Sequence, residues 1–296
     1  MSDKLNFRNV SFTFGTQPIL QDFNLQVRAG EFVSVIGPSG VGKSTLFRLA
    51  SGLLEPTDGT IELDGHSGDK RLGRVGYMPQ RDMLMPWRTI AANAALPLEI
   101  QGVSKKVALQ RVREQLPTFG LEGYADAYPE QLSGGMRQRV SLLRATLTGN
   151  DLLLLDEPFS ALDGLTRMEM QEWLLEQWQR LGHTVVLITH DIDEAILLAD
   201  RVVILPQKPI RDVIEVPVPI ARPRRAECRH EPAFGKVREE IWNLLRGLRE
   251  GTVLEKGSLG AAGEATEGAG TSEKANGTNG ADSTKATVAT GGGHHD

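Results

Sequence analysis

The chain has 296 residues, of which 24% are charged and 40% hydrophobic, so it is long enough to bury a large core and too polar for a membrane protein. Thirty-eight acidic against 33 basic residues give a net charge of -5, which disfavours a basic nucleic-acid-binding module. A single cysteine and a start without a secretory-signal pattern favour the cytoplasm, and no apolar run approaches the roughly 18 residues that span a bilayer, so any membrane role needs a partner.

The first predicted element is a half-buried antiparallel β-sheet near the start of the chain. Apolar and polar residues alternate over residues 22–27, so that Phe23, Leu25 and Val27 share one face of a strand. The pattern then changes to short continuous apolar runs, which are typical of parallel strands buried on both faces. These runs cover residues 32–36, 152–155, 185–188 and 202–205. Together the two patterns predict an α/β fold.

A glycine-rich loop follows the first apolar run and precedes an apolar, helix-compatible segment. Its residues are Gly37, Pro38, Ser39, Gly40, Val41, Gly42, Lys43, Ser44 and Thr45. In such a loop the backbone N–H groups and the helix N-terminus cradle phosphate oxygens, Lys43 reaches the β- and γ-phosphates, and the Ser44 hydroxyl ligates Mg²⁺. The order of strand, loop and helix makes an ordinary glycine-rich turn a poor alternative, so the sequence predicts a nucleotide-binding loop.

A polar, helix-prone stretch separates the first and second apolar runs. In it, Ser104 is placed to cap a helix that carries Val107, Val112, Leu116 and Phe119 on roughly one side. The sequence therefore predicts a helical insert between two parts of the α/β core.

Two acidic residues, Asp156 and Glu157, follow the second apolar run at the carboxyl end of its predicted strand, where open α/β sheets bind ligands. Asp156 is the natural partner of Mg²⁺, whereas Glu157 is placed to polarise an attacking water for in-line transfer of a γ-phosphoryl group. A solvated turn is the alternative for the acidic pair alone. The glycine loop about 110 residues earlier favours the catalytic interpretation.

The last part of the chain carries a basic cluster and then a low-complexity tail. The cluster, formed by Arg222, Arg224, Arg225 and Arg229, is interpreted as a solvated face rather than a lipid site, because stable membrane attachment needs a second signal. Residues 251–296 are predicted to be a disordered tail, since they cannot bury enough apolar surface to offset their ordering entropy. The two adjacent histidines in this tail hold no fixed metal geometry.

The stretch from Gln131 to Arg139, together with the glycine loop and the acidic pair, resembles the ATP-binding-cassette ATPase family over roughly residues 5–245. Further residues resemble the remaining family motifs in the right order. They are Phe14, which would stack on adenine, Gln80 after a strand, Asp163 in the loop behind the catalytic glutamate, and the switch histidine His190. Taken singly, Phe14 would also fit a core position, Gln80 a surface position and His190 a strand end. Their order and spacing carry the resemblance.

The resemblance implies an α/β P-loop fold with a RecA-like parallel-sheet core, an N-terminal antiparallel β subdomain and an inserted helical subdomain. The ATPase domain would span residues 1–250 and the helical subdomain about residues 83–147. ATP and Mg²⁺ are the implied cofactors. Glu157 and His190 would act on the attacking water and the γ-phosphate, and Gln80 would sense Mg²⁺ and water.

A second anion-binding site is expected at the start of another helix. Ser133, Gly134 and Gly135 offer a hydroxyl and backbone N–H groups to an anion at the start of a helix that would begin near Met136. One phosphate cannot obviously serve two helix ends of a single chain. In the family, two cassettes pack head to tail, so that this segment of one subunit closes on the nucleotide held by the other and Asp163 carries a contact between the sites.

The segment 83–89, Met-Leu-Met-Pro-Trp-Arg-Thr, is similar to the cassettes of bacterial importers of nitrate, sulfonate, taurine, bicarbonate and pyrimidine precursors. Beside a mobile glutamine loop, its Met, Leu and Trp side chains would form a groove for a helix from a membrane partner, although the core of the helical subdomain is an equal alternative. The resemblance implies transmembrane permease subunits, an extracytoplasmic solute-binding protein as an indirect partner and no nucleic acid. It also implies a peripheral place on the cytoplasmic face of the inner membrane.

Two other functions remain open. One is a soluble cassette of DNA repair or translation, but repair-type relatives carry a long coiled coil before Ser133, where no sustained heptad occurs here, and translation-type relatives fuse two cassettes. The other is a non-hydrolysing regulatory module, against which the presence of Glu157 and His190 argues. No residue indicates the transported solute.

Overall fold

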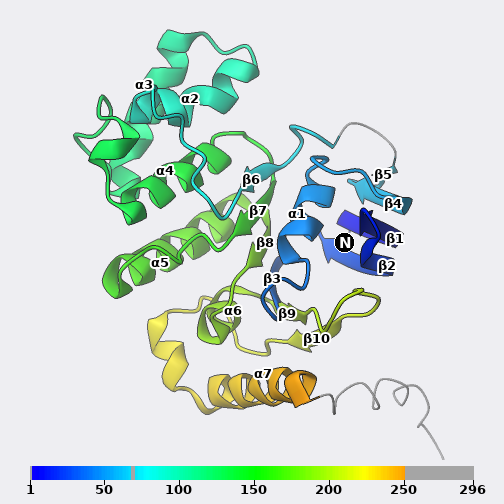
Figure 1. Cartoon of the computed structure of the whole chain (residues 1–296). Helices are drawn as coiled ribbons and strands as arrows, with labels where there is room; N and C mark the ends of the chain where they lie inside the picture. Colours follow the sequence, from blue (N-terminus) through cyan, green and yellow to red (C-terminus); the bar gives the residue numbers. More distant parts are fainter. Residues whose placement is uncertain (1, 68–70, 251–296) are drawn as a thin grey trace, which may run out of the picture. The chain divides into compact units, whose positions relative to one another are not determined.

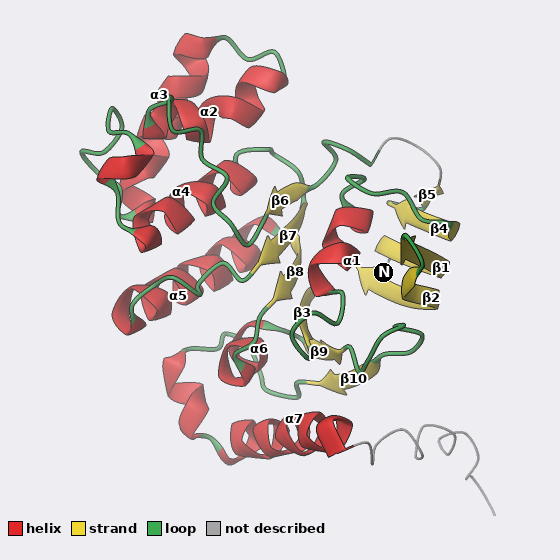
Figure 2. Cartoon of the chain, in the orientation of Figure 1, coloured by secondary structure: helices red, strands yellow, loops and turns green. Residues whose placement is uncertain are grey.

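Two β-sheets and the helices packed around them form the described part of the chain (Figure 1; Figure 2). The computed structural model describes residues 2–67 and 71–250. The predicted tail, 251–296, with its histidines His294 and His295, lies outside the described residues. Among the described helices, none combines the length and the apolar character needed to cross a membrane.

The N-terminal sheet is antiparallel, with the strand order β2-β1-β4-β5. Its strands are β1 (Asp3–Phe14), β2 (Gln17–Arg28), β4 (Asp58–Leu63) and β5 (His66–Ser67). In β2, Phe23, Leu25 and Val27 are buried while the polar residues between them are exposed, which confirms the predicted alternation. Phe7 of β1 packs edge-on against Phe23 across the buried face, with 5.6 Å between the ring centroids.

The second sheet has the strand order β10-β9-β3-β8-β7-β6. Its strands are β3 (Phe32–Ile36), β6 (Gly76–Met78), β7 (Leu152–Asp156), β8 (Thr184–Ile188), β9 (Arg201–Ile204) and β10 (Ile214–Pro217). Neighbouring strands from β9 to β6 run parallel, whereas β10 is antiparallel to β9. The four continuous apolar runs therefore form strands of one parallel sheet, as predicted.

Both faces of the parallel sheet are buried, because successive side chains enter two different hydrophobic cores. In β3, Phe32 and Ile36 belong to a core shared with most of the helices, whereas Val33 and Val35 belong to a core shared with the N-terminal sheet. Helix α1 (Lys43–Ala50) lies between the two sheets (Figure 1) and packs its apolar side into the second core. This packing places the glycine loop at the carboxyl end of β3.

A helical insert lies between β6 and β7 in the sequence and is drawn in cyan and green in Figure 1. Its elements are α2 (Ile90–Ile100), α3 (Lys105–Gln115), η1 (Leu116–Phe119), η2 (Pro129–Gln131) and α4 (Gly134–Thr146). Ser104 is the N-cap residue of α3, but its side chain makes no capping hydrogen bond. The prediction that Val107 shares the buried side is wrong: Ala108 and Val112, four residues apart, form the buried stripe, and Val107 is exposed.

The remaining helices follow β7 or lie near the end of the described chain. They are α5 (Gly164–Leu181), α6 (Ile192–Leu198), η3 (Ala226–His230) and α7 (Pro232–Glu250). Helix α7 packs Phe234, Val237 and Ile241 into the core that the helices share.

The interpretation of the basic cluster as a solvated face is wrong for three of its members, of which Arg229 is partly buried and donates to the buried Gln171 at 3.1 Å. Arg224 is 4% exposed and donates hydrogen bonds to four backbone carbonyl oxygens, including those at the end of α6. Arg222 pairs with Asp200 at 2.8 Å, and its guanidinium lies 4.1 Å from the ring centroid of Trp178. Arg225 is exposed, as expected. Arg222, Arg224 and Arg229 therefore fasten the C-terminal segment, residues 218–250, to the core.

Candidate functional site

The glycine loop turns tightly between β3 and α1. Gly40 and Gly42 have left-handed backbone conformations, with φ of +75° and +125°. A Cβ atom on Gly42 would lie 2.8 Å from Ile19 Cγ2, closer than real Cβ atoms approach. Glycine is therefore required for both the conformation and the packing of this loop.

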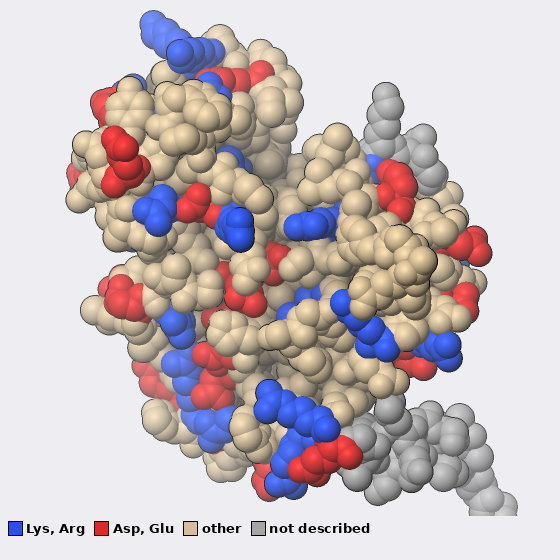
Figure 3. Space-filling model, in the orientation of Figure 1, with Lys and Arg blue, Asp and Glu red and all other residues tan. Residues whose placement is uncertain are grey.

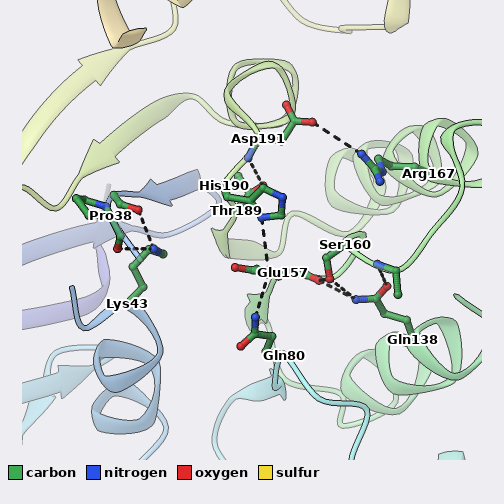
Figure 4. A network of polar contacts seen from close by, with 12 residues as sticks. Pro38, Lys43, Gln80, Gln138, Glu157, Ser160, Arg167, Thr189, His190 and Asp191 are labelled. Carbon is green, nitrogen blue, oxygen red and sulfur yellow. Dashed lines mark hydrogen bonds and ion pairs between the residues drawn. The ribbon is translucent and has the colours of Figure 1, made fainter. Parts of the chain in front are cut away.

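Lys43 lies back over its own loop (Figure 4). Its Nζ donates hydrogen bonds to Gly37 O at 2.8 Å and to Pro38 O at 3.0 Å. Burial lowers the pKa of Lys43, while the nearby charges of Glu157 and Asp156 act in the opposite direction. The ammonium group is thus held at the loop by carbonyl oxygens that an anionic ligand could replace.

A cavity of about 440 Å³ opens in front of the glycine loop. Among its lining residues, those predicted from the sequence are Phe14, Ser39, Gly40, Gly42, Lys43, Ser44, Thr45, Gln80, Asp156 and Glu157. Gly37, Pro38 and Val41 belong to the loop but are not part of the described lining. Gln17, Ile19 and Lys208 also line the cavity and were not predicted. Nothing in the sequence near Lys208 indicates its position, which depends on β9 pairing beside β3.

Asp156 ends strand β7 and is 2% exposed. Burial raises its pKa, as does the charge of Glu157, while a hydrogen bond from the Ser44 hydroxyl and the charge of Lys43 oppose the rise. A buried carboxyl beside a hydroxyl is an oxygen donor set that fits Mg²⁺, and a cation there would favour the ionised carboxylate. The residues present therefore fit the implied metal.

Three predicted catalytic residues, Glu157, Gln80 and His190, meet at the Glu157 carboxylate. The Glu157 φ of +51° is a strained left-handed conformation for a residue other than glycine. Gln80 Nε2 donates to Glu157 Oε2 at 3.1 Å, and His190 Nδ1 lies 3.6 Å from the same oxygen (Figure 4). The three side chains come from the ends of β6, β7 and β8, so the parallel sheet brings them together.

Gln138 is buried in α4 and hydrogen-bonded to the segment that begins at Glu157, a contact that was not predicted from the sequence. Its Nε2 donates to Glu157 O at 2.8 Å and to Ser160 Oγ at 3.2 Å, and its Oε1 accepts from Ala161 N–H at 2.9 Å. One signal was available, because Gln138 precedes the buried Leu142 by four residues and so shares the apolar face of the helix. Helix α4 is thus bonded to the segment that carries Glu157.

Helix α4 begins at Gly134 rather than near Met136, because Ser133 is its N-cap residue. The Ser133 Oγ accepts the N–H of Met136 at 3.2 Å. A Cβ atom on Gly135 would lie 3.0 Å from Leu162 Cδ2, so this glycine allows the close approach of the neighbouring loop. Among the described residues, the lining of the 440 Å³ cavity includes none of the residues from Ser133 to Gly135.

Asp163 and His190 are further predicted residues that the described lining of this cavity does not include. The first of them is exposed at a helix start. Asp163 is the N-cap residue of α5, and its Oδ1 accepts the N–H of Thr166 at 3.1 Å. Hydrogen bonds from Thr166 lower the pKa of this exposed carboxyl. Asp163 is therefore ionised and exposed at the start of a long helix.

The segment 82–89, which follows Gln80, is supported by the buried Asn93 of α2 and by two partly exposed arginines of α4. Asn93 of α2 donates to three backbone carbonyl oxygens of this segment and accepts from Met85 N–H at 2.7 Å. Arg137 of α4 donates to Asp82 Oδ2 at 3.0 Å.

Arg144 of α4 adds hydrogen bonds to Asp82 O and Met83 O, at 2.6 and 2.9 Å. On this support, Trp87 is 74% and Met83 61% exposed. The core alternative is therefore wrong for these two side chains, whereas Leu84 packs partly against the core.

A buried carboxyl, Glu194, lies one helical turn after His190. Desolvation raises its pKa to about 7, and the charge of Asp191 adds to the rise, against hydrogen bonds from Thr189 and Gln171. Since the usual value is 4.5, the folded protein binds more protons than the unfolded chain between pH 4.5 and about 7. The stability that Glu194 contributes is complete below pH 4.5 and is lost as the pH rises through 7.

We expect the free energy of unfolding of the wild type, relative to that of Glu194→Gln, to fall by about 1–3 kcal/mol between pH 5 and pH 8. Glutamine cannot titrate, so the difference between the two proteins isolates this carboxyl. Urea denaturation at several pH values measures it, with the exposed Glu172→Gln as a matched control. A difference that stays constant with pH would contradict the expectation.

Comparison with known proteins places these features in a wider group. Residues 20–160 match the family described as ABC transporter. The chain is 45% identical over 248 residues to the formylaminopyrimidine import ATP-binding protein ThiZ of Halalkalibacterium halodurans, which covers 83% of this chain and 97% of that protein. It is 42% identical over 237 residues to the taurine import ATP-binding protein TauB of Pseudomonas aeruginosa, covering 78% of this chain and 90% of that protein.

A solved structure shares the arrangement of sheets and helices. It is the dimeric ATP-binding cassette MJ0796 in a post-hydrolysis state bound to ADP and Pi. The TM-score is 0.66 at 31% sequence identity, and the match covers 73% of this chain and all of that one. This likeness confirms the fold expected from the sequence, with its parallel core, antiparallel sheet and inserted helices.

Proposed function

Because the chain belongs to the ABC transporter family, we propose that it is the ATP-hydrolysing subunit of a bacterial importer for a small anion or a related solute, of the nitrate, sulfonate, taurine or bicarbonate type. One observation carries the proposal: the glycine loop and Asp156 share a cavity with Glu157, whose carboxylate contacts Gln80 and His190. Residues 1–250 form the ATPase domain, with the helical subdomain at about residues 83–147.

The 440 Å³ cavity suits an adenine nucleotide. The N–H groups of the glycine loop and the Lys43 ammonium bind the phosphates, and the exposed ring of Phe14 at the cavity stacks on adenine. Ser44, Asp156 and Gln80 would hold Mg²⁺, which when bound supplies positive charge that stabilises the transferring phosphoryl group.

The catalytic proposal assigns separate work to the residues around Glu157. Its carboxylate accepts the proton of the attacking water, and Gln80 orients that carboxylate through the hydrogen bond to Oε2. His190 binds the γ-phosphate from the other side of Glu157 and keeps the water in line with it. The contacts at 3.1 and 3.6 Å support this assignment because they hold the three side chains within reach of one oxygen atom.

A second cassette is part of the proposal. The residues Ser133, Gly134 and Gly135 lie at a helix N-terminus outside the lining of the nucleotide cavity, so their anion-binding groups are free to serve a nucleotide on another subunit. We propose a head-to-tail pair of cassettes with two nucleotides between them, in which Asp163 contributes to the contact. The dimeric form of the related structure supports this arrangement.

The membrane partner is proposed to dock on the segment 82–89. A large exposed aromatic side chain on a rigid support is typical of a protein-binding surface, and Trp87 has both properties. The partner would be a transmembrane permease, which places this chain on the cytoplasmic face of the inner membrane and links it indirectly to a solute-binding protein. The names of the import relatives support this assignment.

Copurification tests the importer assignment directly. We would tag the protein in its own host, solubilise the membranes in mild detergent and identify the copurifying proteins by mass spectrometry. A polytopic permease is the expected result, and its solute-binding protein can then be screened for ligands.

Recovery of only DNA, ribosomes or soluble proteins would reject the importer assignment in favour of a soluble cassette.

On the face shown in Figure 3, Lys and Arg side chains intermingle with Asp and Glu. A nucleic-acid-binding face concentrates basic side chains, so this surface favours the importer.

A further inference from the structure

The carboxyl of Glu194 is buried between α6, α5 and the end of β8. Gln171 Nε2 of α5 donates to Glu194 Oε2 at 3.0 Å, and the Thr189 hydroxyl hydrogen-bonds the same carboxyl. These bonds offset part of the cost of burying a carboxyl at 4% exposure. Glu194 has no part in the nucleotide site described above, yet it lies four residues from His190.

The two residues that flank His190 are both tied to Glu194. The Thr189 Oγ accepts the N–H of Asp191 at 3.0 Å. Asp191 is the N-cap residue of α6, and its Oδ1 accepts the N–H of Glu194 at 3.1 Å. With the bond between Thr189 and the Glu194 carboxyl, these contacts form a closed ring of hydrogen bonds around the backbone of His190.

The side chain of His190 is mostly exposed to solvent. It is 69% exposed, and its Nδ1 lies 3.6 Å from Glu157 Oε2, which is longer than a hydrogen bond. Its position is therefore set by its own backbone, and so by the hydrogen bonds of Thr189 and Asp191.

The network continues to the C-terminal segment. Gln171 Oε1 accepts from an Arg229 guanidinium nitrogen in η3 at 3.1 Å. The Arg229 guanidinium can only donate hydrogen bonds, so the Gln171 amide must present its oxygen to Arg229. This orientation directs the Gln171 Nε2 toward Glu194. Arg229 is thereby connected to the His190 loop through two intermediate side chains.

We propose that Glu194 is a positioning residue for His190, and that Gln171 and Arg229 make this positioning depend on the C-terminal segment. The inference rests on the proposed function, because it assigns Glu194 to the hydrolysis of ATP. A displaced His190 slows the reaction without weakening nucleotide binding, since the glycine loop and Lys43 are untouched.

Steady-state kinetics of the full-length protein test the proposal. Glu194→Ala is expected to lower kcat for ATP by about 10–50-fold and to leave KM within about twofold, because a misplaced group costs rate rather than affinity. Glu194→Gln keeps an oxygen that accepts from Gln171, so kcat should stay within about threefold of the wild type. The exposed Glu172→Ala on α5 is the matched control and should change neither value. Equal losses in the Ala and Gln variants would overturn the proposal.

A second measurement separates positioning from a general structural role. In a His190→Ala background, Glu194→Ala should cause no further loss of the residual kcat, because it acts through that histidine. A further loss as large as in the wild-type background would overturn the proposal.

Should Glu194→Ala fail to show a cooperative unfolding transition, Arg229→Ala takes its place. It is expected to lower kcat about three- to fivefold at unchanged KM, and an unchanged kcat would overturn the proposal. Wild-type protein without ATP turnover would reject the proposed function itself. Wild-type turnover that a folded Glu194→Ala protein retains in full rejects this inference alone.

Discussion

Glu157→Gln is expected to lower ATP turnover by about 10²–10⁴-fold while the protein keeps its affinity for ATP, because the amide cannot accept the proton of the attacking water. The side chain at position 157 keeps its size and its contact with Gln80, since Gln80 Nε2 can donate to the amide oxygen as it does to Glu157 Oε2. Phosphate release measures turnover, and titration with a fluorescent ATP analogue measures binding.

The control for this variant is the exposed Glu172→Gln on α5, which should hydrolyse ATP at the wild-type rate. Size-exclusion chromatography with ATP adds a second readout, because a cassette pair that cannot hydrolyse its nucleotides should stay dimeric. Equal turnover in wild type and Glu157→Gln would sink the catalytic assignment and favour a non-hydrolysing regulatory module.

The second large effect is expected for Trp87→Ala, which should abolish copurification with the permease and transport by the complete system. Truncating an aromatic hot-spot residue of an interface costs about 2 kcal/mol or more of binding free energy, or roughly 30-fold in affinity. Basal ATP hydrolysis by the isolated protein should stay within about twofold, because the side chain is exposed and the segment is held by Asn93 through its backbone.

Ile100→Ala is the matched control for this variant. Ile100 is also a large exposed hydrophobic residue of the helical insert, but it ends α2 and lies outside the segment 82–89. It should leave both copurification and hydrolysis unchanged. Loss of nucleotide binding or of folding in Trp87→Ala would count against the docking surface, as would equal losses of permease from both variants.

The parts of the fold that the sequence predicts well are those with a local pattern. The alternation around Phe23 and Leu25 has a period of two because each strand buries one face, and the continuous run in β3 reflects burial on both faces. The glycine loop is predictable for the same reason, since the conformations of Gly40 and Gly42 depend on neighbours in the chain.

The features that escaped prediction depend on contacts between distant segments. Gln138 gains its role from the carbonyl of Glu157, and Lys208 reaches the cavity because β9 pairs with β3. Arg224 looks like a surface residue in the sequence, yet free carbonyl oxygens at the end of α6 satisfy its buried guanidinium. The roles assigned to the individual site residues stay predictions that the variants above can test.

The support of the segment 82–89 has a mechanical consequence. Arg137 and Arg144 fasten this segment to α4, the helix whose first turn is capped by Ser133. In the proposed complex, a permease bound at Trp87 would therefore contact the same helix whose N-terminus would face the neighbouring cassette. Separation of the two cassettes would then displace the permease through this helix. A permease fixed in one conformation would in turn oppose that separation.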